Sequence, residues 1–348
     1  MNRGKPQKFD LLSGRIRELT GPDGAQLPSE RELALRFGCS HLTVRKALKK
    51  LAASGEVHAV SGRGWFTGPD TSPRGKTDQI GFMFPDDEIF YYRIFAEVER
   101  VSASNGLHPV VHLTGGSVQK ENQLLDYFEH SNIQALIAVP NRLCADHYRR
   151  LKIPVLFFDM RLPELEIPQI VSDDYSGALT AVEQLIRLGH VRIAHIGSEY
   201  DYTGEQRLNG YLDALRKYGL AVRKQLIKMR YPSREWGYHA ARELFELKRP
   251  PTAIFCANDT IAAGVVNFCA DRGIGIPEQL SVVGFGNTQT AEYLNLSSVS
   301  QNQNKISGAI CTNLGKLLNR EKIPPLTVIP TTYIARKSVQ ACGGVRKR

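Results

Sequence analysis

Near the start of the chain, apolar residues recur at intervals of three and four positions, the spacing of amphipathic helices. The first stripe consists of Phe9, Leu12, Ile16 and Leu19. Turn-forming residues at 20–24 end it. A second helix is expected after Ser29, because Ser29 and Glu32 have the spacing of a capping box. Gly38 then supplies a helix stop.

A third helix is expected to begin at Ser40, two residues after that stop. Its buried stripe would consist of Val44, Ala47, Leu48 and Leu51. The residues left on its outer surface are His41, Thr43, Arg45, Lys46 and Lys49. Strands over 56–60 and 65–67, joined by a glycine-rich tip, predict a β-hairpin. Two helices with a tight turn and a trailing hairpin form a winged helix-turn-helix, whose second helix fits the major groove of DNA.

After residue 78, short apolar runs alternate with helical segments. Strands are expected at 80–84, 109–113, 135–139, 155–158, 193–196, 253–256 and 280–285, with helices at 90–105, 119–130, 177–188, 206–218 and 260–272. Repeated β-α-β units predict parallel sheets with helices on both faces, and two sets of units imply two lobes. The predicted fold class is α/β: an N-terminal winged helix-turn-helix and a two-lobed, doubly wound parallel-sheet domain.

Composition suggests where these parts meet. The segment 68–77 holds no apolar residue, so we interpret it as a linker. It would separate a DNA-binding domain over 1–67 from an effector-binding and dimerisation domain over 78–340. A basic tail would occupy 341–348.

Positive charge is concentrated at the two ends of the chain. The formal net charge is +10, and residues 1–77 contain 14 Lys and Arg against 7 Asp and Glu. Arg346, Lys347 and Arg348 supply the remaining excess, so the body is neutral. A basic head on a neutral body favours a polyanionic partner, although a merely solvated terminus would have the same composition.

The six cysteines are scattered and lack the spacing of a metal site. We therefore expect no metal and no cofactor, and we interpret the cysteines as reduced side chains of a cytoplasmic protein. The first residues lack the apolar core of a secretory signal, and no apolar run is long enough to span a bilayer. No membrane partner is expected.

Ligands of doubly wound sheets bind beyond the carboxyl ends of the strands, which in a two-lobed protein means the cleft. The polar and aromatic residues predicted at those ends are the candidate effector contacts. They are Asp86, Asp87, Phe90, Tyr91, Asp159, Arg161, Thr203, Arg207, Asn258, Asp259 and Asn287. Each could instead be a helix cap, as Asp259 before Thr260 illustrates. Their convergence on one rim favours binding.

Nearly the whole head resembles the GntR family of winged-helix regulators. The resemblance is carried by LPSERELALRFGCSHLTVRKALKKLAASGEV and by SGRGWF at the hairpin. It implies DNA contacts from Arg31, from residues 40–43 and from Arg45, with backbone approach at the wing glycines. Where family members often carry Arg, this chain has His41. With the basic residues that could neutralise phosphates, the candidate DNA contacts are Arg31, Ser40, His41, Thr43, Arg45, Lys46, Lys49, Gly62, Arg63 and Gly64.

The body resembles the LacI/GalR regulatory domain, which is similar to type I periplasmic binding proteins, over about residues 78–340. The resemblance is carried by RLNGY at 207–211, FCAND at 255–259, SVVGF at 281–285 and YIARKS at 333–338. It implies that Arg207 and Asp259 bind the effector. The family's aromatic pair maps to Phe90 and Tyr91, and its fourth-strand aspartate to Asp159. The chain departs from the family at Gly286, where an aspartate is usual, so one carboxylate contact is missing.

The predicted function is a sequence-specific transcriptional repressor that binds a double-stranded DNA operator as a homodimer. A small molecule, a sugar or sugar derivative, would control its operator affinity. Whether the effector releases or promotes DNA binding stays open. An α/β enzyme is an alternative, but the chain lacks the G-x-G-x-x-G, G-x-x-x-x-G-K-[ST] and G-x-S-x-G motifs. A transport-type binding protein would share the body, but the basic head argues against it.

Overall fold

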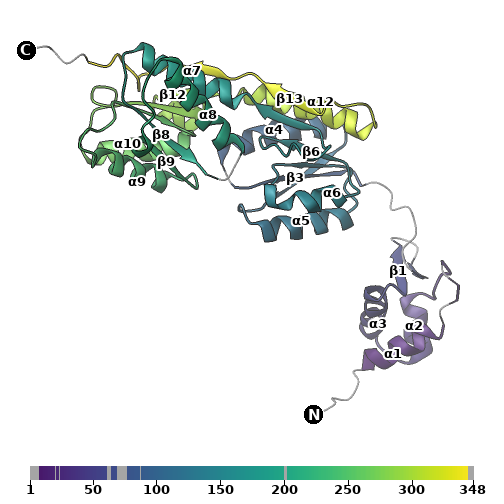
Figure 1. The fold of residues 1–348 in the computed structure, drawn as a ribbon. Coiled ribbons are helices and arrows are strands. Elements are labelled where there is room, and N and C mark those ends of the chain that lie inside the picture. The colour runs from purple at the N-terminus through teal and green to yellow at the C-terminus, as the bar shows by residue number, and fades with distance from the viewer. Residues whose placement is uncertain are drawn as a thin grey trace, which may run out of the picture. The chain divides into compact units, whose positions relative to one another are not determined.

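The computed structural model divides into two compact units, residues 1–75 and residues 76–348 (Figure 1). The residues it describes are 8–19, 21–22, 24–60, 64–68, 77–86, 88–199 and 202–343. Each unit is built around its own buried apolar residues.

The smaller unit contains three helices and a two-stranded hairpin. These are α1 (Lys8–Arg17), α2 (Glu30–Phe37), α3 (His41–Ala53), β1 (Val57–Val60) and β2 (Gly64–Thr67). Strands β1 and β2 are antiparallel. A single core packs the elements together, and its buried members include Leu12, Ile16, Leu33, Leu48 and Leu51. The predicted winged helix-turn-helix is therefore confirmed. The tip of the hairpin, at 61–63, lies outside the described residues.

Local capping sets the ends of α2 and the start of α3. Ser29 Oγ accepts a hydrogen bond from Glu32 N at 3.2 Å, and Glu32 Oε2 accepts one from Ser29 N at 2.7 Å. Gly38 ends α2 at φ +60°, a conformation that glycine adopts without steric cost. Ser40 then caps α3 by accepting from Thr43 N. The predicted capping box, stop and restart are all present.

The first lobe of the larger unit, lobe N, is a parallel six-stranded sheet in the order β13-β7-β6-β5-β3-β4. Its strands are β3 (Gln79–Phe84), β4 (His108–Leu113), β5 (Leu136–Ala138), β6 (Val155–Phe158), β7 (Gln169–Ser172) and β13 (Leu326–Ile329). Its helices are α4 (Ile89–Ala103), α5 (Val118–His130), α6 (Ala145–Arg150) and α12 (Gln303–Leu318), with a 3₁₀ turn at Arg142–Cys144. Alternate residues of β3 enter two cores, one under α4 and α12 and one under α5 and α6.

The second lobe, lobe C, is a six-stranded sheet in the order β14-β12-β11-β10-β8-β9. Its strands are β8 (Ile193–Ser198), β9 (Ile227–Arg230), β10 (Ala253–Cys256), β11 (Ser281–Gly286), β12 (Ser297–Ser300) and β14 (Thr332–Ile334). Its helices are α7 (Asp174–Arg187), α8 (Tyr202–Lys217), α9 (Arg234–Phe245), α10 (Asp259–Asp271) and α11 (Gln289–Tyr293), with a 3₁₀ turn at Lys224–Leu226. Helices α7 and α8 pack over one core of the sheet, and α9 and α10 pack over the other.

The chain passes between the lobes three times: from β7 to α7, from β12 to α12, and from β13 to β14. The three crossings are hydrogen-bonded to one another. Asp173 N donates to Ile329 O at 2.9 Å, and Thr331 Oγ1 donates to Asp173 O at 3.2 Å. Asn302 Nδ2 lies 3.4 Å from Thr332 Oγ1. We refer to residues 172–174, 300–303 and 329–332 together as the hinge.

The predicted two-lobed architecture is confirmed, with two differences in detail. Strand β14 pairs antiparallel with β12, whereas parallel sheets were predicted. Helices α7 and α8 begin at residues 174 and 202, several residues before their predicted starts, because their first turns are polar and lack a helical apolar stripe. The pattern analysis also missed the helices α6, α9, α11 and α12 and five strands at or near sheet edges, β7, β9, β12, β13 and β14.

Helices α9 and α10 approach each other closely at two glycines. A Cβ at Gly264 would overlap the carbonyl oxygen of Arg234, and a Cβ at Gly237 would overlap that of Ile261. Helix α10 begins at Asp259, directly after Asn258. The close packing therefore decides where the first turn of α10 lies.

We expect Gly264→Ala to lower the free energy of unfolding by about 1–3 kcal/mol, because the added methyl group meets backbone that cannot move aside. Gly308→Ala, in α12, is the matched control, since a Cβ there meets no atom within 4 Å. The control should be neutral or stabilising by up to about 1 kcal/mol. Urea unfolding of the intact chain, followed by circular dichroism, measures both. Equal stability of the two variants would contradict the packing argument.

Candidate functional site

The outer face of α3 is the candidate DNA contact surface of the head. The exposed side chains there are His41, Arg45, Lys46 and Lys49. The opposite face is buried in the core. At the start of the helix, Ser40 Oγ and Thr43 Oγ1 lie 2.8 Å apart. The predicted contacts on α3 thus lie on one surface of the unit, with Thr43 half-buried at its start.

Glu30, the first residue of α2, joins three parts of the head. Its Oε2 lies 3.0 Å from Arg45 Nη2 and 3.2 Å from His41 Nε2, and its Oε1 accepts from Trp65 Nε1 at 3.1 Å. Only 16% of the Glu30 side chain is exposed, against 51% for Arg45. Burial acts to raise the pKa of Glu30, but the hydrogen bonds from Arg45 and Trp65 outweigh it, so the pKa is lowered. Glu30 therefore stays charged and orients Arg45.

The sequence analysis missed Glu30, because apolar periodicity and the capping box involve only its neighbours. Arg31, the next residue, is exposed on α2. At the wing, Gly64 opens β2 with φ +100°, a left-handed conformation that suits glycine. Gly62 and Arg63 lie outside the described residues.

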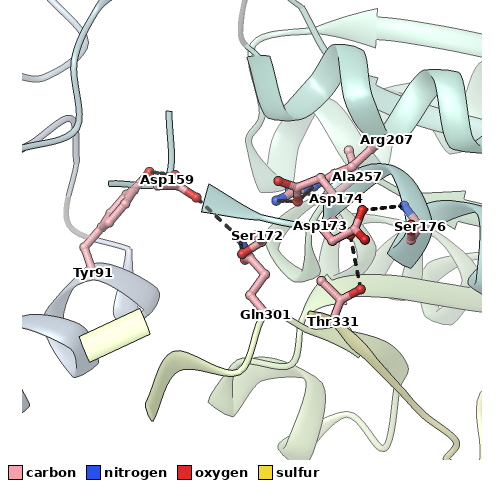
Figure 2. A network of polar contacts seen from close by, with 10 residues as sticks. All are labelled: Tyr91, Asp159, Ser172, Asp173, Asp174, Ser176, Arg207, Ala257, Gln301 and Thr331. Carbon is pink, nitrogen blue, oxygen red and sulfur yellow. Dashed lines mark hydrogen bonds and ion pairs between the residues drawn. The ribbon is translucent and has the colours of Figure 1, made fainter. Parts of the chain in front are cut away.

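Lobe N contributes a tyrosine–carboxylate pair at the carboxyl ends of its strands (Figure 2). Tyr91 OH donates to Asp159 Oδ2 at 2.8 Å, and both side chains are buried. Burial, together with Asp159, raises the pKa of Tyr91 well above its ordinary value, so the hydroxyl remains a donor. Phe90 packs into the core of the lobe. Arg161 is half-buried, and Asp87 lies outside the described residues.

Arg207 is the buried cation of lobe C. Its Nε donates to Asp174 Oδ1 at 2.9 Å, and its Nη1 donates to Ala257 O at 2.7 Å (Figure 2). Its guanidinium carbon lies 3.9 Å from the centre of the Phe285 ring, within the range of a cation–π contact. Thr203, one turn earlier on α8, is also buried. The sequence analysis missed Asp174 because it follows β7, a strand that the pattern did not predict.

Asp259 points into lobe C. Its Oδ2 accepts from Thr288 N at 2.7 Å and from Thr288 Oγ1 at 3.0 Å, and its Oδ1 accepts from Ser298 Oγ at 2.7 Å. Burial raises the pKa of Asp259 to about 6, although these hydrogen bonds and Arg336 act to lower it. Both carboxylate oxygens are therefore engaged by lobe C itself.

Asn258 and Asn287 lie on either side of Asp259. Asn258 is the N-cap of α10, because its Oδ1 accepts from Ile261 N at 2.8 Å. The alternative that Asp259 caps the helix is therefore wrong. Asn287 Oδ1 accepts from Arg336 Nη2 at 2.7 Å. The predicted residues of lobe C thus gather at the ends of β8, β10 and β11.

A hinge residue that the sequence analysis missed connects the hinge to lobe N. Gln301 Nε2 lies 3.2 Å from Ser172 Oγ and 3.4 Å from Asp159 Oδ1, as donor to both (Figure 2). Gln301 itself is buried. It therefore joins the Tyr91–Asp159 pair to two of the three crossings.

Three strained residues mark the same region. Asp159, Asn287 and Asn302 have φ values of +65°, +49° and +56°, which are uncommon for residues other than glycine. Asp159 and Asn287 directly follow β6 and β11, and Asn302 lies in the hinge. Backbone strain of this kind concentrates at ligand sites and switch regions.

Glu88, the residue before α4, also connects the lobes and was not predicted. Its Oε1 accepts from Thr260 Oγ1 at 3.2 Å, in the first turn of α10, and from Nδ2 of the N-cap Asn258 at 3.4 Å. Burial and the nearby Asp86 raise the pKa of Glu88 to about 7. Its closeness to two other acidic residues in the sequence, Asp86 and Asp87, was the available signal.

A separate cavity of about 270 Å³ lies at the amino ends of β5 and β6. Its lining includes Ile133, Lys152, Leu317 and Arg320 but none of the predicted effector contacts. Among the described residues, no three His, Cys, Asp or Glu side chains gather as a possible metal site. Within that part of the chain, every helix is too short or too polar to cross a membrane.

Two family models match parts of the chain. The model of the bacterial regulatory proteins of the gntR family matches residues 8–67. The model of the periplasmic binding protein-like domain matches residues 182–339.

Curated relatives cover most of the chain. The arabinose metabolism transcriptional repressor of Geobacillus stearothermophilus is 28% identical over 295 residues, which are 80% of each chain. The HTH-type transcriptional repressor CytR of Escherichia coli K12 is 30% identical over 235 residues, covering 66% of this chain and 69% of CytR.

Solved structures share the fold. The transcription regulator CcpA of Lactococcus lactis matches with a TM-score of 0.71 and 21% identity, covering 75% of this chain and 99% of CcpA. A complex of the transcriptional regulator CelR with cellobiose matches with a TM-score of 0.70 and 20% identity, covering 90% of this chain and all of CelR.

Glu88 makes stability depend on pH. Because its folded pKa of about 7 exceeds the ordinary 4.5, the folded chain binds more protons than the unfolded chain between these values, so stability falls as pH rises through that window. Between pH 5 and pH 8, we expect the free energy of unfolding to fall by about 1–2 kcal/mol less in Glu88→Gln than in the wild type. The difference is smaller than the full pKa shift would give because Glu88 is only partly shielded from water. Asp259 titrates in the same direction and is retained in both proteins.

Urea unfolding of the wild-type and Glu88→Gln chains at several pH values measures the difference. Glu97→Gln, an exposed change on the same helix, should leave the pH profile unaltered. Parallel profiles for wild type and Glu88→Gln would contradict the assignment of this pH dependence to Glu88.

Proposed function

This chain belongs to the LacI/GalR family of transcriptional repressors and carries a gntR-family head, and from this premise we propose how its two units act together. It is a sequence-specific DNA-binding regulator whose operator affinity is controlled by a small molecule. One observation carries the proposal: an exposed basic recognition helix and a two-lobed fold with a three-crossing hinge occur in one chain. The relatives found are transcriptional regulators rather than enzymes.

In the proposed complex, α3 enters the major groove of the operator, and the hairpin approaches the adjacent backbone. The proposed contacts are Arg31, Ser40, His41, Thr43, Arg45, Lys46, Lys49, Gly62, Arg63 and Gly64. Arg45 is the base-reading candidate because Glu30 orients its guanidinium and guanidinium groups pair with guanine. Lys46 and Lys49 are exposed and would neutralise phosphates.

The proposed division of labour follows the chain. Residues 1–67 bind DNA, 68–77 link the units, 78–340 bind the effector and form a homodimer, and 341–348 are a basic tail. A homodimer would match an operator with two-fold symmetry. The proposed location is the cytoplasm, where operator DNA is accessible.

The proposed effector is a sugar or sugar derivative bound between the lobes. Support comes from the arabinose repressor among the relatives and from the polar side chains at the strand ends. The proposed contacts are Asp87, Phe90, Tyr91, Asp159, Arg161, Thr203, Arg207, Asn258, Asp259 and Asn287. An effector there would change the angle between the lobes through the hinge. Couplings of this kind typically amount to about 1–3 kcal/mol.

The first test concerns DNA recognition. A duplex selected from a random pool by the intact protein should lose about 1–3 kcal/mol of binding free energy on Arg45→Ala, with relaxed preference at one base position. Arg36→Ala removes the same charge from the end of α2 and should keep the base preference. Binding isotherms and a second selection with each variant measure both effects. Unchanged affinity and base preference for Arg45→Ala would remove Arg45 from the interface.

The second test concerns the effector. Arg207→Lys keeps the charge but loses the planar fork that engages Asp174 and Ala257. We expect at least tenfold weaker binding of any sugar that raises the melting temperature of the wild type, because one lost charged hydrogen bond amounts to about 1.5–3 kcal/mol. Duplex affinity without the sugar should stay within about twofold.

Arg216→Lys, an exposed change on the same helix, is the matched control and should bind the sugar normally. Calorimetric titration gives the sugar affinities, and far-UV circular dichroism establishes that each variant is folded. A folded Arg207→Lys variant with wild-type sugar affinity would refute the assignment of Arg207.

A further inference from the structure

Glu88 lies at the point where α4 of lobe N meets α10 of lobe C. Besides its hydrogen bonds to Asn258 and Thr260, the first half of α4 makes a second contact between the lobes, with Arg93 Nη2 4.0 Å from Glu292 Oε2 on α11. Both contacts lie on the side of the carboxyl strand ends. A molecule held between the lobes at these strand ends therefore has Glu88 as a neighbour.

Three donor groups near this point are engaged by the protein. Arg207 donates to Asp174 and to Ala257 O, and Tyr91 OH donates to Asp159. The amide of Gln301 also donates to Asp159. Each of these three donor groups therefore already has an acceptor within the protein.

Hydrogen-bond acceptors, in contrast, are available at this point. A carboxylate has two oxygens with two lone pairs each. Glu88 Oε1 accepts both hydrogen bonds from α10, and its Oε2 accepts none from the described residues. Asp86 and Asp159 face Glu88 from lobe N, and Arg207 faces it from lobe C. The charges of Asp86 and Asp159 each act on Glu88 more strongly than the charge of Arg207, which is itself paired with Asp174.

The titration of Glu88 agrees with this geometry. Burial is the main cause of its raised pKa, and the charges of Asp86 and Asp159 raise it further, while Arg207 and the hydrogen bond from Thr260 lower it. A bound cation would favour the charged form of Glu88.

We propose that Glu88 is a specificity-determining residue of the effector site, selecting molecules that present a cationic amine to lobe N over neutral hydroxyl compounds, and disfavouring carboxylates and phosphates. This inference rests on the proposed function. Its physical basis is that an amine supplies hydrogen-bond donors to the Glu88 carboxylate and a positive charge beside Asp86 and Asp159. An anion would lie beside the like charges of Glu88, Asp86 and Asp159.

The interlobe hydrogen bonds give Glu88 a fixed direction. Thr260 and Asn258 engage Oε1, so the carboxylate cannot rotate freely, and a preorganised acceptor loses less conformational freedom on binding. An amine would reach the same carboxylate without displacing α10. We therefore expect Glu88 to act as a direct contact of the effector and to keep its contacts with lobe C.

The experiment measures affinities of the intact protein at pH 8 for matched triplets of probes. Each triplet holds a parent compound, an amine and a carboxylate that differ at a single carbon, such as glucose, 6-amino-6-deoxyglucose and glucuronate, in which the primary alkyl amine is protonated at pH 8. Nucleoside triplets with a 5′-hydroxyl, a 5′-amine and a 5′-carboxylate extend the set. Thermal shift finds the skeleton that binds, and calorimetry then gives the three dissociation constants.

The wild type should bind the amine about tenfold or more tightly than the parent compound, and the carboxylate more weakly than the parent. Glu88→Gln keeps the shape and removes the charge, so it should bring the amine and the parent within about threefold of each other. Thr260→Val removes one hydrogen bond to Glu88 and retains its charge, so it should keep the amine preference. Glu97→Gln is the control for a charge change elsewhere on α4.

The outcomes separate this inference from the proposed function. A wild type that prefers the carboxylate overturns the role of Glu88 while small-molecule sensing stands. A folded Glu88→Gln variant with the wild-type ranking also overturns it. If no skeleton of any triplet binds, the proposed sugar-responsive function fails, and the inference fails with it.

Discussion

The three crossings between the lobes are the constraint on which the larger unit depends. The sheet of lobe N includes β13 and the sheet of lobe C includes β14, both added after the chain has crossed to the other lobe, so neither lobe is a continuous stretch of chain. Backbone and side-chain hydrogen bonds join the crossings to one another, as between Asp173 and Ile329 and between Thr331 and Asp173. A change in the angle between the lobes must therefore move all three segments together. Three linked crossings of this kind can turn a small shift at a bound ligand into a rigid-body movement of the lobes.

Electrostatics at the lobe boundary follows from the same geometry. Parallel strands present their carboxyl ends on one side, and the helices that follow begin there, so polar residues gather from distant parts of the sequence. Each buried charge has a partner: Asp174 neutralises Arg207, and Ser298 and Thr288 engage Asp259. Gln301 reaches from the hinge to Asp159, which also accepts from Tyr91. Charge compensation and hinge contacts therefore share the same side chains (Figure 2).

The head illustrates how a recognition surface can be preorganised without its ligand. Helix α3 buries Val44 and Leu48 in the core and thereby presents the opposite face to solvent. Glu30 adds a directional restraint, because its carboxylate contacts Arg45 and the indole of Trp65 together. A long arginine side chain held in this way loses less rotamer freedom when it meets a base.

Sequence patterns predicted well the elements that have a strong local signal. The capping box of Ser29 and Glu32, the Gly38 stop and the buried stripe of α3 are local features, and all are present. Local signals failed where tertiary packing decides the structure. Helix α9 mixes charged residues with Gly237, which packs against α10, and the short edge strands carry no clear alternation.

Part of the candidate site could also be predicted, because some of its residues follow strands with a strong local signal. Strand ends could be placed from apolar runs, which led to Tyr91, Asp159 and Arg207. The partners that connect segments far apart in sequence could not be found this way: Glu30 lies 15 residues from Arg45, and Glu88 lies 172 residues from Thr260. Nothing in a local window indicates such pairings.

The central claim is that binding of a small molecule between the lobes controls the affinity of the head for DNA. The most direct test measures the affinity of the intact protein for its selected duplex at one salt concentration, with and without a saturating small molecule that binds the larger unit. The account predicts a change of about 5–150-fold in that affinity. A molecule that saturates the larger unit through Arg207 and leaves duplex affinity unchanged would contradict it.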